Sequence, residues 1–326
     1  MTGRSAGHAV ELLLPGADTD DRERWLEVRR RGITASEIGL ILGYRPSADA
    51  PSPFALYQQK LGLADDTDNP RLRLGRYLEG YVCDVFADRH PEYHVLRLGL
   101  AASSERMWQM ASCDRVAVPA GQLATHGGQL TLAQPVPVEA KTSSTYDGWG
   151  PDGSEVIPVH YFTQVMWQMD VLGAPAGYVA CLFLLTQKVR VYEIPRDDDA
   201  IAVMREAAAE FRQRLEDRNP PATDELPATR RALAAMYQPD PGVADVALPR
   251  RLAVSYLAAV RAYSAAEQRK RKWENRVRAA MGAARYAVDG RTGEKIATRT
   301  VYKTTGYYRE GGTVDRLTPA RRKEQE

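Results

Sequence analysis

The 326-residue sequence contains only three cysteines and no long apolar segment. Cys83, Cys113 and Cys181 lie far apart and form no C-x-x-C pair. A disulfide framework, a zinc site and an iron–sulfur cluster are therefore not expected. No run approaches the roughly 18 apolar residues of a membrane span, and the N-terminus lacks the apolar core of a signal peptide. We therefore predict a cytoplasmic protein without membrane contact.

The overall composition is that of an ordinary globular protein, with 44% hydrophobic and 26% charged residues. The net charge of +2, however, conceals an asymmetry. Residues 251–326 contain 18 Lys and Arg against 8 Asp and Glu, a net of +10, whereas residues 1–250 contain 26 against 34, a net of −8. A basic tail on an acidic body predicts a polyanionic partner, although a solvated basic helix has the same composition.

The N-terminal third of the chain has helical patterns. Residues 1–19 show no periodicity and are expected to form an extension. Further along, Thr34 and Glu37 fit the capping box that begins a helix. Helices are predicted at 21–31, from Thr34 to a stop at Gly43, at 52–62 and at 71–89. The last of these is expected to bury a wide apolar stripe formed by Leu74, Tyr77, Leu78, Tyr81, Val82, Val85 and Phe86.

From residue 94 the pattern changes to short strands. Strands are predicted at 94–99, 107–118, 136–140, 177–185 and 188–194, with an exposed loop at 119–134. Helices are predicted at 158–172 and from 197–199 to 217, and a long helix at 249–283 precedes a hairpin closed at Asp289–Gly290. This order predicts an α/β (α+β) core followed by a helical appendage.

The segment V-P-V-E-A-K-T at 136–142 carries the chemistry that we consider most informative. Glu139 and Lys141 lie on one strand face because side chains alternate, and Asp114 precedes them on another predicted strand. Asp114, Glu139 and the backbone carbonyl of Ala140 would give Mg²⁺ the oxygen ligands that it prefers. The ammonium of Lys141 would orient the attacking water or stabilise developing charge. The same alternation equally fits an exposed strand with a surface ion pair.

Four motifs occur together and in a definite order. They are R-x6-S at 29–36, G-x-x-x-E at 75–79, D…E-x-K at 114–141 and Y-x-x-Q at 161–164. With the run W-L-E-V-R-R-R-G-I-T-A-S-E at 25–37, they make the chain resemble the YqaJ-type viral recombinase and phage lambda exonuclease family. That family belongs to the P-D-(D/E)-x-K nuclease superfamily. The resemblance covers roughly residues 20–195, which hold all four motifs.

The resemblance implies roles for particular residues. Two residues would hold the terminal 5′-phosphate of the DNA strand, namely Arg29 and Ser36. The metal and catalytic set, with Mg²⁺ or its substitute Mn²⁺, would comprise Glu79, Asp114, Glu139 with the carbonyl of Ala140, Lys141 and, lining the site, Gln164. The chain departs from the family at Cys113, where relatives commonly have Pro, and at Arg115, where they commonly have Gly.

The resemblance also implies a fold and an activity. The fold would be a restriction-endonuclease-like mixed sheet flanked by helices, with an extension at 1–19, an exonuclease core at 20–221, a linker at 222–248 and a basic helix and hairpin region at 249–326. The activity would be 5′→3′ digestion of double-stranded DNA ends in a bacterial or phage-infected cell. It would leave 3′ overhangs for an annealing protein, and the enzyme would form a homo-oligomer, a trimer in some relatives. The alternatives are an endonuclease or repair nuclease on the same core, or a non-catalytic DNA-end-binding recombination protein.

Overall fold

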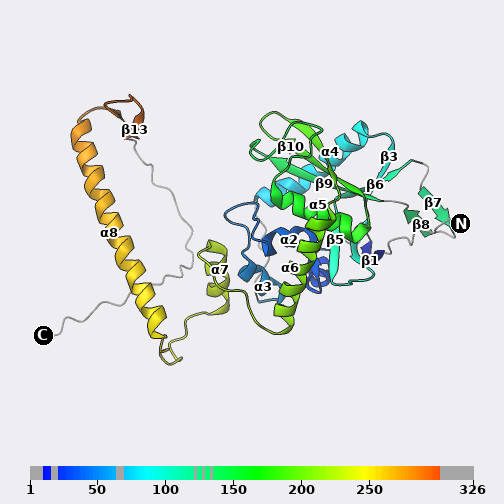
Figure 1. The fold of residues 1–326 in the computed structure, drawn as a ribbon, viewed down its shortest axis with the longest axis horizontal. Helices are drawn as coiled ribbons and strands as arrows, with labels where there is room; N and C mark the ends of the chain where they lie inside the picture. Colours follow the sequence, from blue (N-terminus) through cyan, green and yellow to red (C-terminus); the bar gives the residue numbers. More distant parts are fainter. Residues whose placement is uncertain are drawn as a thin grey trace. The chain divides into compact units, whose positions relative to one another are not determined.

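The computed structural model describes residues 10–15, 21–63, 70–120, 123–126, 129–132 and 135–301. The chain divides into two compact units, Met1–Gln238 and Pro239–Glu326 (Figure 1). Mixed helices and sheets form the first unit, as predicted, and a long helix with a small hairpin forms the second. Within the described stretches, no helix is long and apolar enough to cross a membrane.

The first helices begin close to the predicted positions. Asp21 caps α1 (Arg22–Arg30) by accepting a hydrogen bond from the backbone N–H of Arg24 at 3.1 Å. The capping box of Thr34 and Glu37 starts α2 (Ala35–Ile41), and Ser52 caps α3 (Pro53–Lys60), whose first turn contains Pro53. The predicted capping box of Thr34 and Glu37 is confirmed, because hydrogen bonds between residues close in sequence form it.

The wide apolar stripe predicted for α4 (Pro70–Arg89) is wrong on one side. Val82 and Phe86 are fully buried, as expected, but Tyr77 is 79% exposed, Tyr81 51% and Leu74 47%. The cause is that α4 packs one narrow face on a sheet, so residues turned away from that face meet solvent.

The main sheet has five strands and is mixed, as predicted. Its order is β11 (Lys188–Pro195), β10 (Ala176–Phe183), β9 (Val136–Ser143), β6 (Arg115–Pro119) and β3 (Tyr93–Leu96), and only the β9–β10 pair is parallel. Val179 and Cys181 of β10 join the core that contains α5 (Val159–Leu172), whereas Tyr178 and Ala180 join the core that contains α4. The two helices therefore cover opposite faces of this sheet.

A second sheet contains four strands in the order β1 (Val10–Pro15), β4 (Gly99–Ser103), β5 (Gln109–Cys113) and β2 (Ile33–Thr34). The predicted strand at 107–118 is thus two strands in different sheets, and Asp114 lies at the break. Part of the predicted extension at 1–19 also belongs to the fold, because β1 pairs with β4 and Leu14 is buried.

Two further segments differ from the sequence-based expectations. The predicted loop at 119–134 contains a hairpin of β7 (Leu123–His126) and β8 (Gln129–Leu132). The predicted linker contains α7 (Pro227–Met236), whose Ala228 and Ala232 pack on Phe54 and Ala55 of α3. Small side chains gave α7 little apolar signal, yet they allow close helix packing. Asp197 caps α6 (Asp198–Glu216), as predicted.

The second unit consists of α8 (Arg250–Met281) and an antiparallel hairpin of β12 (Tyr286–Val288) and β13 (Lys295–Thr298). The predicted helix and hairpin are therefore both present. None of the residues of α8 is buried.

Candidate active site

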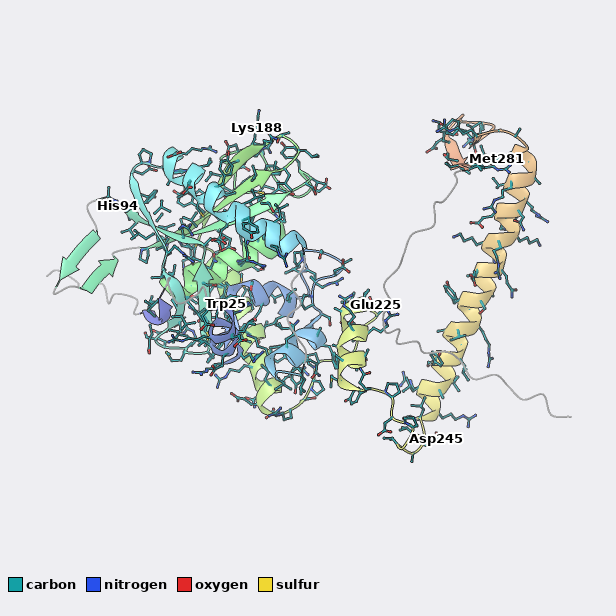
Figure 2. All side chains as sticks on the ribbon, turned by 180° about the vertical axis from the view of Figure 1, so that it is seen from behind. Trp25, His94, Lys188, Glu225, Asp245 and Met281 are labelled. Atoms are coloured by element: carbon teal, nitrogen blue, oxygen red, sulfur yellow. The ribbon has the colours of Figure 1, made fainter. Side chains whose placement is uncertain are left out.

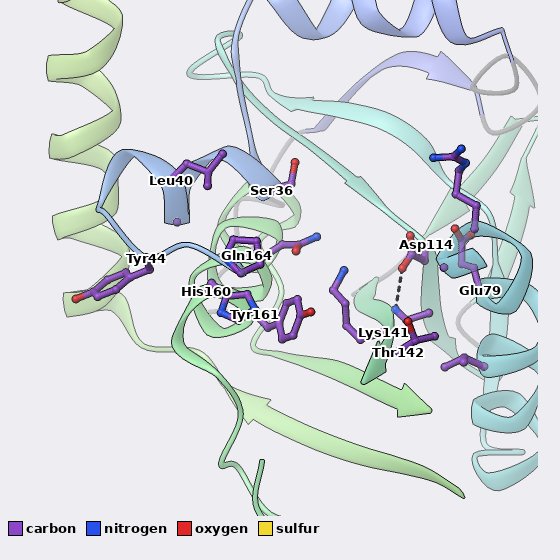
Figure 3. A pocket seen from close by; sticks show the side chains of 16 residues that line it. Ser36, Leu40, Tyr44, Glu79, Asp114, Lys141, Thr142, His160, Tyr161 and Gln164 are labelled. Atoms are coloured by element: carbon purple, nitrogen blue, oxygen red, sulfur yellow. Dashed lines mark hydrogen bonds between the residues drawn. The ribbon is translucent and has the colours of Figure 1, made fainter. Parts of the chain in front are cut away.

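A cleft opens in the first unit where two neighbouring strands separate. Arg115 of β6 pairs with Val138 of β9, but at Asp114 the chain leaves this sheet and continues back into β5 of the other sheet. Beyond Val138, β9 therefore has no β6 partner. The carboxylate of Asp114 takes the place of the missing strand and accepts a hydrogen bond from the backbone N–H of Ala140 at 2.7 Å (Figure 3).

Glu139 is buried on the α5 side of the sheet. Val138 packs in the α4 core, and because strand residues alternate, Glu139 points to the opposite face. Its side chain is only 4% exposed. One carboxylate oxygen, Oε1, accepts hydrogen bonds from Lys141 and Gln164, and the other, Oε2, accepts one from Gln168 at 2.6 Å. A surface ion pair on an exposed strand is therefore excluded for this motif.

Glu79 reaches the same cleft from α4. Its carboxylate lies 3.5 Å from the guanidinium of Arg115 and remains 33% exposed. The cleft has a volume of about 360 Å³, and its lining includes Glu79, Asp114, Lys141 and Gln164. Helices on opposite faces of the sheet thus contribute to one site, because Glu79 of α4 and Gln164 of α5 line the same cleft (Figure 3).

Negative charge dominates the interior of this site. Burial and the nearby Glu139 raise the pKa of Asp114 well above its ordinary value. Burial also raises the pKa of Glu79, with Arg115 opposing and Glu139 adding to the effect. Burial alone would lower the pKa of Lys141, but attraction to Glu139 and Asp114 raises it instead. One ammonium therefore does not fully compensate the carboxylates around it.

The donors fit a hard divalent cation. Asp114, Glu139 and the Ala140 carbonyl would supply oxygen ligands, and an added cation would relieve the charge that raises the Asp114 pKa. Among the described residues, however, no three His, Cys, Asp or Glu side chains are already grouped closely enough to hold a metal ion. Glu79 pairs with Arg115 instead. The fit therefore concerns the chemistry of the donors, with Glu79 at the edge of the site.

Arg29 and Ser36 come together, as their motif predicted. The Nη2 atom of Arg29 donates to the Ser36 hydroxyl at 3.1 Å, to Thr34 at 3.0 Å and to Glu37 at 3.0 Å. Ser36 lines the cleft and also a neighbouring cavity of about 270 Å³, which Arg29 lines as well. Ser36 therefore stands between the carboxylates and the arginine.

Sequence reasoning missed the buried lysine of this region. Lys60 donates to Glu37 at 2.7 Å and to the backbone carbonyls of Arg29 and Gly32 at 2.7 and 2.6 Å. Burial opposes the ionised form of Glu37, but Lys60 and Arg29 together hold its pKa below the ordinary value. Two cations face one carboxylate here, which leaves a net positive charge. No local sequence pattern indicates the role of Lys60, because the carbonyls of Arg29 and Gly32 that it contacts lie 31 and 28 residues away in the sequence.

Two further residues border the site. His160 also lines the cleft, and its buried Nε2 atom has no hydrogen-bond partner within the part of the chain that the structure describes. Burial and the nearby Lys141 lower its pKa to about 4, so the imidazole is neutral at physiological pH. Cys113, next to Asp114, is buried, and burial raises its pKa well above the ordinary value. Cys113 packs in the core cluster that also contains residues of α5.

Comparison with known proteins agrees with the motifs. Residues 24–178 match the YqaJ-like viral recombinase domain. The curated "Uncharacterized protein YqaJ" of Bacillus subtilis (strain 168) is 26% identical over 278 residues, covering 82% of this chain and 81% of that protein. LHK-Exo is an alkaline exonuclease from Laribacter hongkongensis, and its structure in complex with dAMP is similar to this one. The alignment covers 60% of this chain and 94% of LHK-Exo, at 19% identity and a TM-score of 0.46. A phage related exonuclease from Haemophilus somnus 129PT aligns over 57% of this chain and 94% of its own at 10% identity and a TM-score of 0.41.

The fold and the cleft define this part of the chain as an α/β domain with a site of carboxylates and a lysine, located where β6 and β9 of the main sheet separate. Residues 24–178 are similar to the YqaJ-like viral recombinase domain. The family resemblance predicted from the four motifs is thereby confirmed.

Proposed function

We propose that this protein is a Mg²⁺-dependent deoxyribonuclease that digests double-stranded DNA from 5′ ends and leaves 3′ overhangs for recombination. The observation that carries the proposal is the buried Glu139, held by Lys141 and two glutamines beside the carboxylate of Asp114. Burying such a charged group costs stability that its partners must offset, and buried charges of this kind concentrate at functional sites. The match of residues 24–178 to the YqaJ-like viral recombinase domain supports the same activity.

Asp114, Glu139 and the Ala140 carbonyl would hold the cation, with Glu79 completing its surroundings. A bound Mg²⁺ ion would supply an activated water and neutralise charge on the phosphoryl oxygens. Gln164 and Gln168 hold Glu139 in one orientation through hydrogen bonds to both carboxylate oxygens. They thus preorganise the ligand before substrate binds.

Lys141 would act on the substrate side of the site. Its ammonium bonds Glu139 and lies 5.2 Å from the centre of the Tyr161 ring, at the wall of the cleft. A cation held there stabilises negative charge that develops on a phosphoryl oxygen, or orients the attacking water. In the metal-free site, attraction to Glu139 and Asp114 raises the pKa of Lys141 and favours its ammonium form.

Arg29 and Ser36 would bind the terminal 5′-phosphate. The Ser36 hydroxyl opens on the cleft, and Arg29 and Lys60 against one Glu37 provide net positive charge behind it. An arginine and a hydroxyl together suit a phosphate monoester. This arrangement would place the strand end next to the carboxylates and would make the enzyme depend on DNA ends.

Digestion of linear duplex DNA tests the site. We expect Glu139→Gln and Lys141→Met to abolish Mg²⁺-dependent digestion while DNA binding in EDTA is retained. Wild-type digestion rates in either variant would refute the assignment. Closed-circular DNA should stay intact, and its cleavage would favour an endonuclease on the same core.

The end pocket is tested with matched substrates and variants. Wild-type protein should digest 5′-phosphorylated ends faster than 5′-hydroxyl ends, and Arg29→Gln and Ser36→Ala should remove this preference. Arg30→Gln is the matched control, because Arg30 is exposed on the same helix. If the control loses the preference equally, general charge and not the pocket accounts for it.

The proposal extends to the organisation of the protein. The nuclease core, expected at residues 20–221, would also include β1 and α7 of the first unit. A single-strand annealing protein would receive the 3′ overhang. A homo-oligomer, such as a trimer around the duplex, would keep the enzyme on its substrate. Sedimentation of the full chain with and without duplex DNA tests the oligomer directly.

A further inference from the structure

The second unit carries most of the positive charge of the protein. Residues 1–238 contain 25 Lys and Arg against 32 Asp and Glu, and residues 239–326 contain 19 against 10. The net charges are therefore −7 and +9, which sum to the +2 of the whole chain. A body with net negative charge repels a polyanion at long range, so affinity for DNA requires concentrated positive charge elsewhere.

The positive charge of α8 is concentrated on one side of the helix. The helix contains nine Lys and Arg residues and two Glu residues. At about 100° per residue, six of the cations fall within one sector of roughly 100°. We call these residues the basic stripe: Arg250, Arg251, Arg261, Arg269, Lys272 and Arg276.

The opposite side of α8 has a different character. Both glutamates lie there, together with the half-buried Tyr256 and Val260. Glu274 lies 3.8 Å from Lys270 and from Arg278, two cations outside the basic stripe. Among the described residues, Arg261, Arg269 and Lys272 form no ion pair, so the stripe keeps its charge available.

Exposed aromatic rings accompany these cations. Trp273 is 55% exposed, and the Arg276 guanidinium lies 4.8 Å from its ring centre. In the hairpin, Tyr286 is 40% exposed and lies beneath Lys295 at 4.3 Å. No residue of α8 is fully buried, and side chains project from the helix along its length (Figure 2).

We infer that the basic stripe of α8 binds the phosphate backbone of duplex DNA as a site separate from the cleft. The stripe is about 39 Å long at about 1.5 Å per residue, which is close to one turn of B-DNA. The inference rests on the proposed action on DNA and adds an anchoring element to it. Contacts of this kind fix no base sequence and weaken with salt.

The test compares two triple variants of the full chain. Arg261→Gln/Arg269→Gln/Lys272→Gln removes three charges from the basic stripe. Lys270→Gln/Arg271→Gln/Arg278→Gln removes three charges from the other sides of the same helix. Glutamine supports helix nearly as well as lysine and arginine, so helix content by circular dichroism should be unchanged in both.

Binding of a blunt 30-base-pair duplex is measured by fluorescence anisotropy in EDTA between 50 and 200 mM NaCl. Losing three phosphate contacts should lower the slope of log K against log salt by about 2.7, so the affinity ratio across this range falls by about 40-fold. The control variant should keep a slope close to that of the wild type. Equal slopes in the two triple variants would overturn the inference.

Sedimentation of the same samples tests whether a second copy of the chain, and not DNA, binds the basic stripe. A wild-type oligomer that dissociates in the stripe variant would identify the stripe as an interface between copies, and would also overturn the inference. Digestion in Mg²⁺ is scored separately. If the wild type binds DNA through the basic stripe but digests none, the proposed function is refuted and this inference stands. If the wild type digests DNA but the stripe variant binds DNA as the control does, only this inference is refuted.

Discussion

Neutralising Asp114 should stabilise the metal-free protein. Burial and Glu139 raise the pKa of Asp114 well above its ordinary value of 3.8, so ionisation at pH 7 costs folding free energy. The cost has an upper bound of about 4 kcal/mol, because each pKa unit between 3.8 and 7 is worth about 1.36 kcal/mol. We therefore expect Asp114→Asn to raise the free energy of unfolding in EDTA by about 1–4 kcal/mol.

The pH dependence of unfolding tests whether the Asp114 carboxylate destabilises the folded protein. A carboxyl whose folded pKa is raised destabilises the protein above its unfolded pKa, and the cost disappears as the pH falls through the folded value to the unfolded one. The advantage of Asp114→Asn should therefore shrink between pH 7 and about pH 4. Urea denaturation followed by tryptophan fluorescence measures it. Asp84→Asn, an exposed change on α4, is the control and should show little effect.

Adding Mg²⁺ should oppose the effect of the substitution. A cation at 100 times its dissociation constant stabilises the folded wild type by about 2.7 kcal/mol, and the variant should lose most of this gain. A less stable Asp114→Asn protein in EDTA would contradict the electrostatic argument. Equal stabilisation of both proteins by Mg²⁺ would show that Asp114 is not a ligand.

Three other predictions concern residues outside the metal ligands. Burial raises the pKa of Cys83 and Cys181 to about 12, so Ellman's reagent at pH 7.5 should react with neither thiol until urea is added. Asp170 is fully buried, and hydrogen bonds from two arginines outweigh the effect of burial and lower its pKa. Asp170→Asn should therefore lower the free energy of unfolding at pH 7, measured by urea denaturation, by about 2–4 kcal/mol. The difference between the two proteins should vanish as the pH falls below 3.8. Gln168→Leu should lower kcat for digestion about 10- to 100-fold with little change in KM, because Glu139 loses an orienting donor.

Local chemistry made much of the fold predictable. The capping box of Thr34 and Glu37 depends on residues within one helical turn, and the structure has it where the sequence indicated. The family motifs likewise brought Arg29 to Ser36 and Gln164 to Glu139. Such patterns are visible because each requires particular residue types at fixed spacing.

Long-range pairing accounts for what the sequence concealed. The run 107–118 is continuously strand-like, so nothing local separates β5 from β6 at Asp114. The burial of Glu139 depends on which side of the sheet α5 covers, which alternation alone leaves open. Lys60 could be placed beside Glu37 only once α2 and α3 were packed together.

The assignment of Glu139 to a Mg²⁺-dependent nuclease site can be tested in one experiment. A 5′-phosphorylated linear duplex is incubated with the wild type or with Glu139→Gln, each in Mg²⁺ and in EDTA. We predict that the wild type shortens the 5′ strand in Mg²⁺ only, and that Glu139→Gln binds the duplex but leaves it intact. Digestion by Glu139→Gln at the wild-type rate, or equal digestion by the wild type in EDTA, would contradict the account.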